Sequence, residues 1–499
     1  MARWNVTRPS GSTVVNNYEG DKAYKPSAEL ELFLRFLTNY VREDKFYTSA
    51  DEDFNDFVEA FKKAAMKDPE FVAKLVVYAR EEMNLRSAPT LGAVLLANLP
   101  EYKGTGTPRV VGRRVFTRPD MLTEALAAQF ALFGKRPIPN SLKKALRDSI
   151  VRFDRYQIAK YRCDNCEVKL KDVVLLTHPK PRDAGQAQTF KDLIEGKLKN
   201  ERTWETIVST QGSTKESWEK ALSEWVKYRQ IFALLRNLRN LIKNEVDEEL
   251  FKQGLEILKD PQRMKKGRIY PYRYLSAYVT INVYAPESPK QARMKNLALQ
   301  ALREGIENLV ETVPKLDGKV LVAIDISGSM TWSVSSNSIV NRAWIAALYG
   351  ALVAKRNSAD IVLFNHKTHW IGMKGTVMET AESIIREVGG STDAWKVIDD
   401  ILQSNEKYDY IIFITDEQVY DSYGYYGKFQ KLMSQYRREI NSNVCVITWD
   451  LAGYGNIMLP EHDLRNVYIS GFSEKALEIV DCLLKGNKIV DYIKQRVVL

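Results

Sequence analysis

The feature that most constrains the fold is a change in the spacing of apolar residues near Gly318. Before it, apolar side chains recur at intervals of three and four, as in residues 30–41, and this spacing predicts amphipathic helices. After it, short runs of consecutive apolar residues alternate with helical stretches. Such runs are typical of strands buried inside a parallel sheet. The spacing therefore predicts a helical region followed by an α/β region.

The helical region extends from residue 28 to about residue 310, with Pro, Gly or Asn between its amphipathic stretches. Residues 54–65 repeat the first pattern, and Asp68 with Pro69 is the N-cap and first-turn pair expected at a third helix. Antiparallel helix pairs stacked as HEAT-like repeats would bury these faces and leave a concave surface for a long partner. Residues 1–27 are polar and are predicted to be an extended entry segment.

The α/β region has four strand-like runs, at residues 319–324, 361–364, 410–414 and 444–448. Helical stretches are expected between them, at residues 341–355, 380–388, 394–405 and 427–440. This alternation predicts a Rossmann-like, doubly wound domain with ligands at the carboxyl ends of its strands. The predicted domains are therefore the entry segment 1–27, the helical repeats 28–315 and the α/β domain 316–499.

Charge divides at the same boundary. The chain has a net charge of +10, but residues 316–499 have a balance of −3, which leaves +13 on residues 1–315. That asymmetry favours a polyanion as the partner of the helical region. No apolar run approaches the length of a membrane span, and the first residues lack a secretory signal. With four cysteines and no disulfide framework, a cytoplasmic protein with no membrane partner is expected.

A candidate metal motif follows the first apolar run, where Asp325, Ser327 and Ser329 are spaced as D-x-S-x-S. The motif resembles the metal-ion-dependent adhesion site of von Willebrand factor A (vWA) domains, and its oxygens suit a hard cation. Thr392 in a glycine-rich turn and Asp416 after another apolar run supply the two remaining pieces. The resemblance implies that the three hydroxyls bind Mg²⁺ and that Asp325 and Asp416 act directly or through water.

Alternatives to this interpretation stay open. D-x-S-x-S by itself also suits a capped turn between a strand and a helix, and Ser391, just before Thr392, is an alternative ligand. Sites of this type usually leave one metal position for an acidic residue of a partner, which is binding and not catalysis. Ser327 lacks the G-x-S-x-G context of a nucleophile, and no phosphate-binding G-x-x-x-x-G-K-[ST] loop is present, so no enzyme is predicted.

Cys163 and Cys166 form a single C-x-x-C. Structural zinc needs four ligands, no second C-x-x-C exists, and the nearest other candidate ligand is His178. Zinc and redox roles remain alternatives, and two reduced cysteines are the expected state.

Two cation clusters are candidate RNA surfaces. One runs from Lys143 to Arg182, and the other, over residues 263–274, mixes cations with tyrosines. Lys and Arg neutralise phosphates, and tyrosine rings stack on unpaired bases. The alternative for each cluster is a solvated helix face with tyrosines in the core.

The chain as a whole resembles the Ro ribonucleoprotein family, which joins a TROVE module to a vWA-like domain. Residues 14–20 and 46–47 resemble bacterial-type members. The other stretches that carry the resemblance lie in both regions, at 175–180, 234–238, 268–272, 323–330, 389–393 and 413–417. One departure is Tyr270, which stands where the family has His.

The resemblance implies that the helical repeats close into a monomeric ring. It also implies that an outer basic surface binds small structured Y-like RNA and that the hole takes single-stranded 3′ ends of misfolded RNA. By position, Lys160 and His178 would lie on the outer surface, and the charge argument adds Arg155, Arg162 and Lys180. For the hole, the inferred residues are Lys265, Lys266, Arg268, Tyr270 and Arg273. An exoribonuclease is a candidate protein partner.

The sequence thus predicts a non-catalytic RNA-binding protein that acts in RNA quality control or as an RNA-processing scaffold. The rival hypothesis is an adaptor whose vWA-like domain grips an acidic partner residue through Mg²⁺. An RNA-cleaving enzyme is a third class, for which no acid/base pair is visible.

Overall fold

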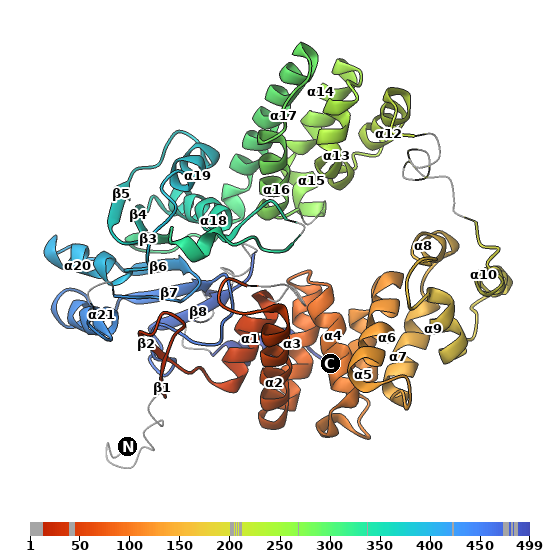
Figure 1. The fold of residues 1–499 in the computed structure, drawn as a ribbon, viewed down its shortest axis with the longest axis horizontal. Coiled ribbons are helices and arrows are strands. Elements are labelled where there is room, and N and C mark those ends of the chain that lie inside the picture. The colour runs from red at the N-terminus through yellow and green to blue at the C-terminus, as the bar shows by residue number, and fades with distance from the viewer. Residues whose placement is uncertain are drawn as a thin grey trace. The chain divides into compact units, whose positions relative to one another are not determined.

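A computed structural model describes residues 13–499 except for 39–44, 200–203, 205, 207, 209–211, 268, 337, 422–423, 473–478, 481–482 and 484–487 (Figure 1). The chain forms two compact units. Unit 1 contains Met1–Ser27, Arg42–Asp53 and Val208–Asn487, and unit 2 contains Ala28–Val41, Phe54–Ile207 and Lys488–Leu499. The predicted helical region 28–315 is therefore shared between the units, and residues 488–499 group with the N-terminal helices.

Unit 2 is built from helices that stack in pairs. They are α1 (Ala28–Thr38), α2 (Ala50–Lys67), α3 (Pro69–Glu81), α4 (Ser87–Asn98), α5 (Thr107–Val115), α6 (Pro119–Phe133), α7 (Asn140–Ile150), α8 (Arg155–Lys160), α9 (Leu170–Thr177), α10 (Ala184–Ile194) and α23 (Ile489–Arg496). Contacts join α3 to α5, α5 to α7 and α7 to α9, while α4 contacts α6, as expected of a helical-repeat stack.

Local sequence explains several of these helices. Asp68 caps α3, because its Oδ1 atom accepts a hydrogen bond from the Phe71 amide at 3.0 Å. Gly112 allows α5 and α7 to approach closely, since a Cβ atom there would lie 2.6 Å from the Ala145 Cβ atom. At the other end of the chain, Lys494 of α23 forms an ion pair with Asp68 at 2.6 Å, which attaches this helix to α3.

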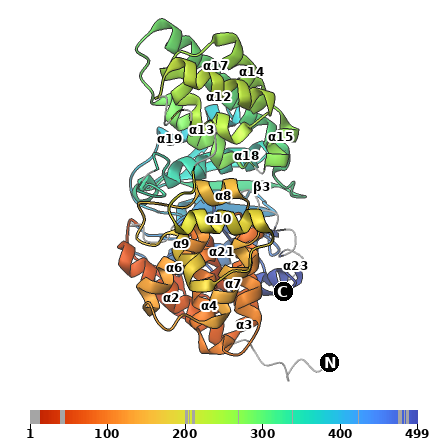
Figure 2. The same cartoon turned by 90° about the vertical axis from the view of Figure 1, so that its right-hand side faces the viewer.

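Unit 1 combines helices with a sheet. Its helices before the sheet are α12 (Lys215–Lys227), α13 (Ile231–Lys243), α14 (Glu248–Leu258), α15 (Pro261–Gly267), α16 (Pro271–Asn282) and α17 (Pro289–Asn308). Figure 2 shows α12, α13 and α14 close together, in agreement with their mutual contacts. Within this unit, α16 contacts α18 and α17 contacts α19, so these helices and the α/β domain form a continuous packed body.

The sheet has six strands in the order β5-β4-β3-β6-β7-β8. The strands are β3 (Val320–Asp325), β4 (Asp360–Phe364), β5 (Thr368–Ile371), β6 (Tyr410–Thr415), β7 (Cys445–Asp450) and β8 (Asn466–Ser470). All pairs are parallel except the β4–β5 pair. The four predicted strands are thus confirmed, while β5 and β8 were not predicted. β5 is half exposed at an edge, which explains its weak apolar signal.

Helices cover both faces of the sheet, as Figure 1 shows. They are α18 (Arg342–Asn357), α19 (Val377–Ile385), α20 (Trp395–Gln403) and α21 (Lys428–Glu439). Leu321 and Ala323 share a core with side chains of α20 and α21, such as Ile398 and Phe429. Ile324 points to the other face, where α18 packs so closely that a Cβ atom on Gly350 would lie 2.3 Å from it.

The entry segment, which was predicted to be extended, contains two paired strands. It forms a hairpin of β1 (Val14–Asn16) and β2 (Lys22–Tyr24), paired in antiparallel register. Tyr24 exchanges backbone hydrogen bonds with Ile457, which fixes the hairpin to unit 1. In the part of the chain that the structure describes, no helix is both long and apolar enough to cross a membrane.

Candidate metal centre and cation-rich surfaces

The predicted metal residues come together at the carboxyl ends of β3 and β6. Backbone hydrogen bonds tie the loops that carry them: Gly328 N donates to Gly390 O at 2.9 Å, and Gly389 N donates to Ile326 O at 2.7 Å. The third loop is attached through Tyr420 N, which donates to Thr392 O at 2.9 Å. Three segments distant in sequence therefore form one framework, as expected at the carboxyl edge of a doubly wound sheet.

All five predicted metal residues are buried, with exposed fractions of 0% for Asp325 and Asp416 and 1–3% for Ser327, Ser329 and Thr392. The Ser327 and Ser329 hydroxyl oxygens are 3.2 Å apart. Asp325 accepts hydrogen bonds from the Ser327 amide at 2.8 Å and from the Thr415 hydroxyl at 2.6 Å. The arrangement places hydroxyls beside two carboxylates in a water-poor site.

Burial makes ionisation of both carboxylates unfavourable. Burial, followed by the charge of Asp416, raises the pKa of Asp325 to about 7. Burial also raises the pKa of Asp416, whose Oδ2 atom has no hydrogen-bond partner among the described residues. Buried charges need compensation. A hard cation would supply it, so this donor set fits Mg²⁺. In the described part of the chain no group of three or more His, Cys, Asp or Glu is arranged for a metal, which makes the hydroxyls essential to such a site.

Ser391 and Thr392 differ in burial and in hydrogen bonding. The Ser391 hydroxyl donates to Asp393 Oδ2 at 3.1 Å, and Ser391 is only partly buried. Thr392 is 3% exposed, and its backbone holds the turn in place. Its burial and its place in the framework make the Thr392 hydroxyl the better candidate for a cation ligand.

Several polar residues around this site were not predicted. Glu417 and Asp450 are almost fully buried, and burial raises the pKa of each. Tyr47, which lies 369 residues before Asp416 in the chain, donates a hydrogen bond to Glu19, and its neighbour Phe46 packs edge-on against Trp332. A single acidic or aromatic residue far away in the sequence carries no signal for such a contact, because only the tertiary fold brings it there.

The first cation cluster lies in unit 2, around α8, α9 and the turn that follows α9. Lys160, His178 and Lys180 are exposed, and His178 adopts a left-handed conformation with φ of 47° at the end of α9. Arg155 and Arg162 are instead ion-paired, to Asp192 at 2.9 Å and to Asp164 at 2.6 Å. Part of the predicted positive charge is therefore already neutralised within the chain.

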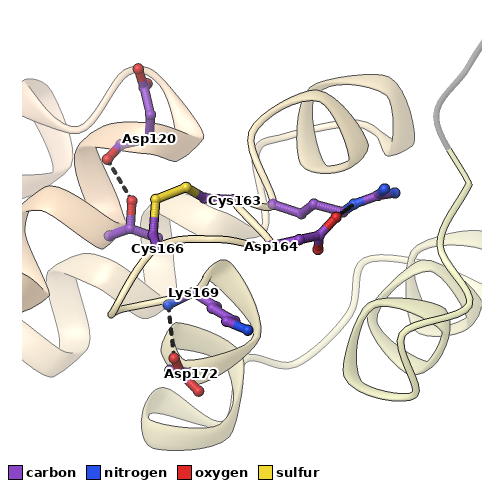
Figure 3. Close-up of a disulfide and its surroundings, with 8 residues drawn as sticks. Asp120, Cys163, Asp164, Cys166, Lys169 and Asp172 are labelled. Carbon is purple, nitrogen blue, oxygen red and sulfur yellow. Dashed lines mark hydrogen bonds and ion pairs between the residues drawn. A yellow bond between two sulfur atoms is a disulfide. The ribbon is translucent and has the colours of Figure 1, made fainter. Parts of the chain in front are cut away.

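The structure joins Cys163 and Cys166 in a disulfide, as Figure 3 shows. The expectation of two reduced cysteines is wrong for this pair, because the turn between α8 and α9 brings their Cα atoms to 5.5 Å, a separation typical of disulfides. The cysteine pair lies close in sequence to Arg162 and Lys169. The Lys169 amide donates a hydrogen bond to Asp172 Oδ2 at 2.8 Å at the start of α9.

The second cation cluster lies in unit 1. Lys265 and Lys266 are exposed at the end of α15, whereas Arg268 lies outside the described residues. Tyr270 is the half-buried N-cap of α16. The exposed Arg273 stacks on Phe232, with 5.6 Å between the guanidinium carbon and the ring centre. Phe232 is 47% exposed and was not predicted, although an aromatic residue on the polar face of α13 is a signal that could have found it.

Comparisons with known proteins agree with this architecture. Residues 194–319 match the TROVE domain family, and residues 319–483 match the Ro60 vWA domain family. The boundary between the two lies close to the predicted one at residue 315. The likeness to the crystal structure of the Deinococcus radiodurans RO (RSR) protein supports the fold, with a TM-score of 0.63, 19% identity, and coverage of 92% of this chain and 100% of that one.

Three relatives whose descriptions are known have low sequence identity to this chain, between 21% and 24%. The chain is 24% identical over 318 residues to the RNA-binding protein RO60 of Caenorhabditis elegans, covering 59% of this chain and 48% of that protein. It is 23% identical over 465 residues to the RNA-binding protein RO60 of Deinococcus radiodurans, covering 81% and 83%. It is 21% identical over 305 residues to telomerase protein component 1 of Rattus norvegicus, covering 45% and 12%. The match thus spans about half the length of the Caenorhabditis protein.

Proposed function

We propose that this chain, a member of the Ro family by its TROVE and Ro60 vWA domains, is an RNA-binding protein. The observation that carries the proposal is the succession of these two domains over residues 194–483. Relatives described as RNA-binding proteins support it, as does the exposed positive charge of both units. Long-range attraction to phosphates is the physical basis of such binding, so affinity falls steeply with salt.

In this proposal the two cation clusters take different parts of an RNA. Lys160, His178 and Lys180 contact the backbone of a small structured, Y-like RNA, with Arg155 and Arg162 contributing less because they are paired. The surface of Lys265, Lys266, Arg273 and Phe232 takes single-stranded 3′ ends of misfolded RNA, because a cation beside an exposed ring suits an unpaired base. The role is RNA quality control or scaffolding, without catalysis.

The vWA domain is proposed to hold Mg²⁺. Ser327, Ser329 and Thr392 would bind the cation through their hydroxyls, while Asp325 and Asp416 accept hydrogen bonds from its waters or bind it directly. When bound, the cation supplies positive charge to a buried acidic site and so holds its three loops together. The unpartnered Oδ2 atom of Asp416 supports this assignment.

We also propose that an exoribonuclease is a protein partner and that the helical repeats close into a monomeric ring. Light scattering coupled to size-exclusion chromatography measures the mass, and a dimer would contradict the monomer. Sequencing of the RNA that copurifies with the protein identifies the natural ligand.

Filter binding of a hairpin RNA with a single-stranded 3′ tail tests the function. We expect binding that weakens steeply from 50 to 200 mM salt and that does not change with EDTA, since the cation clusters lie outside the metal centre. Absence of binding at 50 mM salt, or binding insensitive to salt, would falsify the proposal. Cleavage of the RNA during the assay would instead indicate an enzyme.

A further inference from the structure

The N-terminal hairpin is fixed against the loop that carries Asp416. The Asn17 side-chain amide donates to Val419 O at 2.5 Å, and the Tyr18 amide donates to Gln418 Oε1 at 2.8 Å. At the other side of the turn, Gly427 N donates to Asp21 Oδ1 at 2.8 Å. Residues 17–21 therefore form the tip of a hairpin that is held two to three residues beyond a predicted metal ligand.

Glu19, in this tip, is bound by Tyr47. The Tyr47 hydroxyl donates a hydrogen bond to the Glu19 carboxylate. The Tyr47 ring stacks on Tyr18, with ring centres 5.6 Å apart and planes 12° apart, and meets Tyr454 edge-on at 5.4 Å. The hairpin and residues 45–49, both in unit 1, therefore contact each other at one place on the carboxyl edge of the sheet, next to Tyr454, which follows β7.

That point is the candidate metal centre. Phe46, next to Tyr47, meets Trp332 edge-on with ring centres 6.0 Å apart, three residues beyond the proposed ligand Ser329. Burial, the hydrogen bond to Glu19 and the charge of Asp416 raise the pKa of Tyr47. Glu19 in turn contributes to raising the pKa of Asp416. A carboxylate held by a tyrosine beside two buried carboxylates is costly unless a cation offsets the charge.

We propose that Tyr47 and Glu19 form an intrachain cap on the metal centre and occupy the position that an acidic residue of a partner would otherwise take. The inference rests on the proposed Mg²⁺ site. Tyr47 and Phe46 cover the loop that carries the ligand Ser329, and Glu19 binds the cation's waters from the outer side. The cation consequently clamps the N-terminal hairpin onto the sheet, and the centre serves the chain's own architecture rather than an adaptor role.

Mn²⁺ titration of the full chain, followed by electron paramagnetic resonance of the free ion, tests the cap in the presence and absence of acetate. In the wild type we expect one bound ion whose affinity does not respond to acetate, because the cap fills the carboxylate position. Glu19→Ala should bind Mn²⁺ about 10-fold more weakly, as is typical of outer-sphere partners, and acetate should restore the affinity.

Tyr47→Phe is the second variant, because it removes only the hydroxyl and keeps the ring stack. It should show a smaller loss and the same gain from acetate. Tyr426→Phe is its matched control, since it removes a hydroxyl that donates to Asn16 of the same hairpin at 3.0 Å, away from the metal centre. Glu311→Ala, which removes a carboxylate paired to Arg356, controls for charge.

The outcomes distinguish a failure of the proposed metal site from a failure of the proposed cap. If the wild type binds no Mn²⁺, the metal site itself is refuted. If the wild type binds Mn²⁺ but responds to acetate as strongly as Glu19→Ala, the centre is open and the cap is refuted. Equal affinity in the wild type and both cap variants, without any effect of acetate, also refutes the cap while leaving the metal site in place.

Discussion

The candidate metal centre of unit 1 and the cation-rich surface of unit 2 hold charge in opposite ways. In the centre, Asp325 and Asp416 are fully buried, and one oxygen of Asp416 lacks a partner among the described residues. On the surface around α8 and α9, Lys160 and Lys180 face solvent and Arg155 has a local counter-ion. Burial makes each group of the centre hard to replace, whereas exposure makes the contributions of the surface small and additive. Mutations in the centre should therefore nearly abolish cation binding, whereas each mutation on the surface should weaken RNA binding by a small factor.

The largest expected effect is on the metal centre. Asp325→Ala combined with Ser327→Ala should lower the Mg²⁺ affinity of the full chain at least about 100-fold, because it removes a carboxylate and a hydroxyl from a preformed site. Isothermal titration calorimetry measures the affinity. Ser383→Ala, which removes a hydroxyl bonded to Thr380 O in α19, is the control. Retained Mg²⁺ binding would refute the ligand assignment.

Charge reversal on the cation surface should have the next largest effect. Lys160→Glu with Lys180→Glu should weaken binding of the hairpin RNA by about 30-fold and make the log–log salt slope shallower by about two, one unit per lost phosphate contact. Filter binding at several salt concentrations measures both quantities. Lys103→Glu with Lys135→Glu changes the net charge equally at exposed positions elsewhere in unit 2. Equal losses in both double variants would show that only net charge matters.

A third prediction concerns the cost of buried negative charge in metal-free protein. Burial raises the folded-state pKa of Asp450, whose Oδ2 atom has no hydrogen-bond partner within the described ranges. An acid with a raised pKa loses stability as pH rises from its unfolded value, about 3.9, through its folded value. Asp450→Asn removes that loss and keeps an acceptor for the Ala452 and Gly453 amides.

The difference in melting temperature between Asp450→Asn and the wild type should therefore grow by about 3 °C in favour of the variant as the pH rises from about 4, near the unfolded pKa, to 8, in EDTA. Thermal unfolding followed by circular dichroism measures it. Asp463→Asn is the control, because ion pairs with Arg437 and Arg465 help to lower the pKa of Asp463, and its difference should not grow in the same direction. A difference that stays constant with pH would contradict the prediction.

The smallest effect distinguishes an arginine that is ion-paired to a carboxylate from an exposed lysine on the same surface. Arg155→Gln should weaken RNA binding less than about 2-fold, because the guanidinium is already paired with Asp192 at 2.9 Å. Lys160→Gln should cost about 3-fold, since its ammonium is exposed. Competition binding with labelled hairpin resolves such differences. A larger loss for Arg155→Gln would mean that RNA displaces Asp192 from the arginine.

Periodicity predicted much of the fold. The runs at residues 319–324, 361–364, 410–414 and 444–448 became β3, β4, β6 and β7, because a strand buried on both faces must be apolar throughout. The hairpin β1–β2, the edge strand β5 and the last strand β8 escaped prediction. Each is short or bordered by polar residues, so its pattern does not differ from that of a loop.

By itself, the sequence determined the metal motif, the order of helical and α/β regions and the sign of their charges, since local spacing and composition carry that information. Only the tertiary structure decided which segments share a unit, such as α23 with α3 and the N-terminal hairpin with the loop of Asp416. It also decided which cations are paired, and it joined Cys163 to Cys166. The physical reason is that burial and pairing depend on how the chain folds back on itself, over 3 residues for the cysteines, 37 for Arg155 with Asp192 and 402 for Asn17 with Val419, and no local pattern specifies that path.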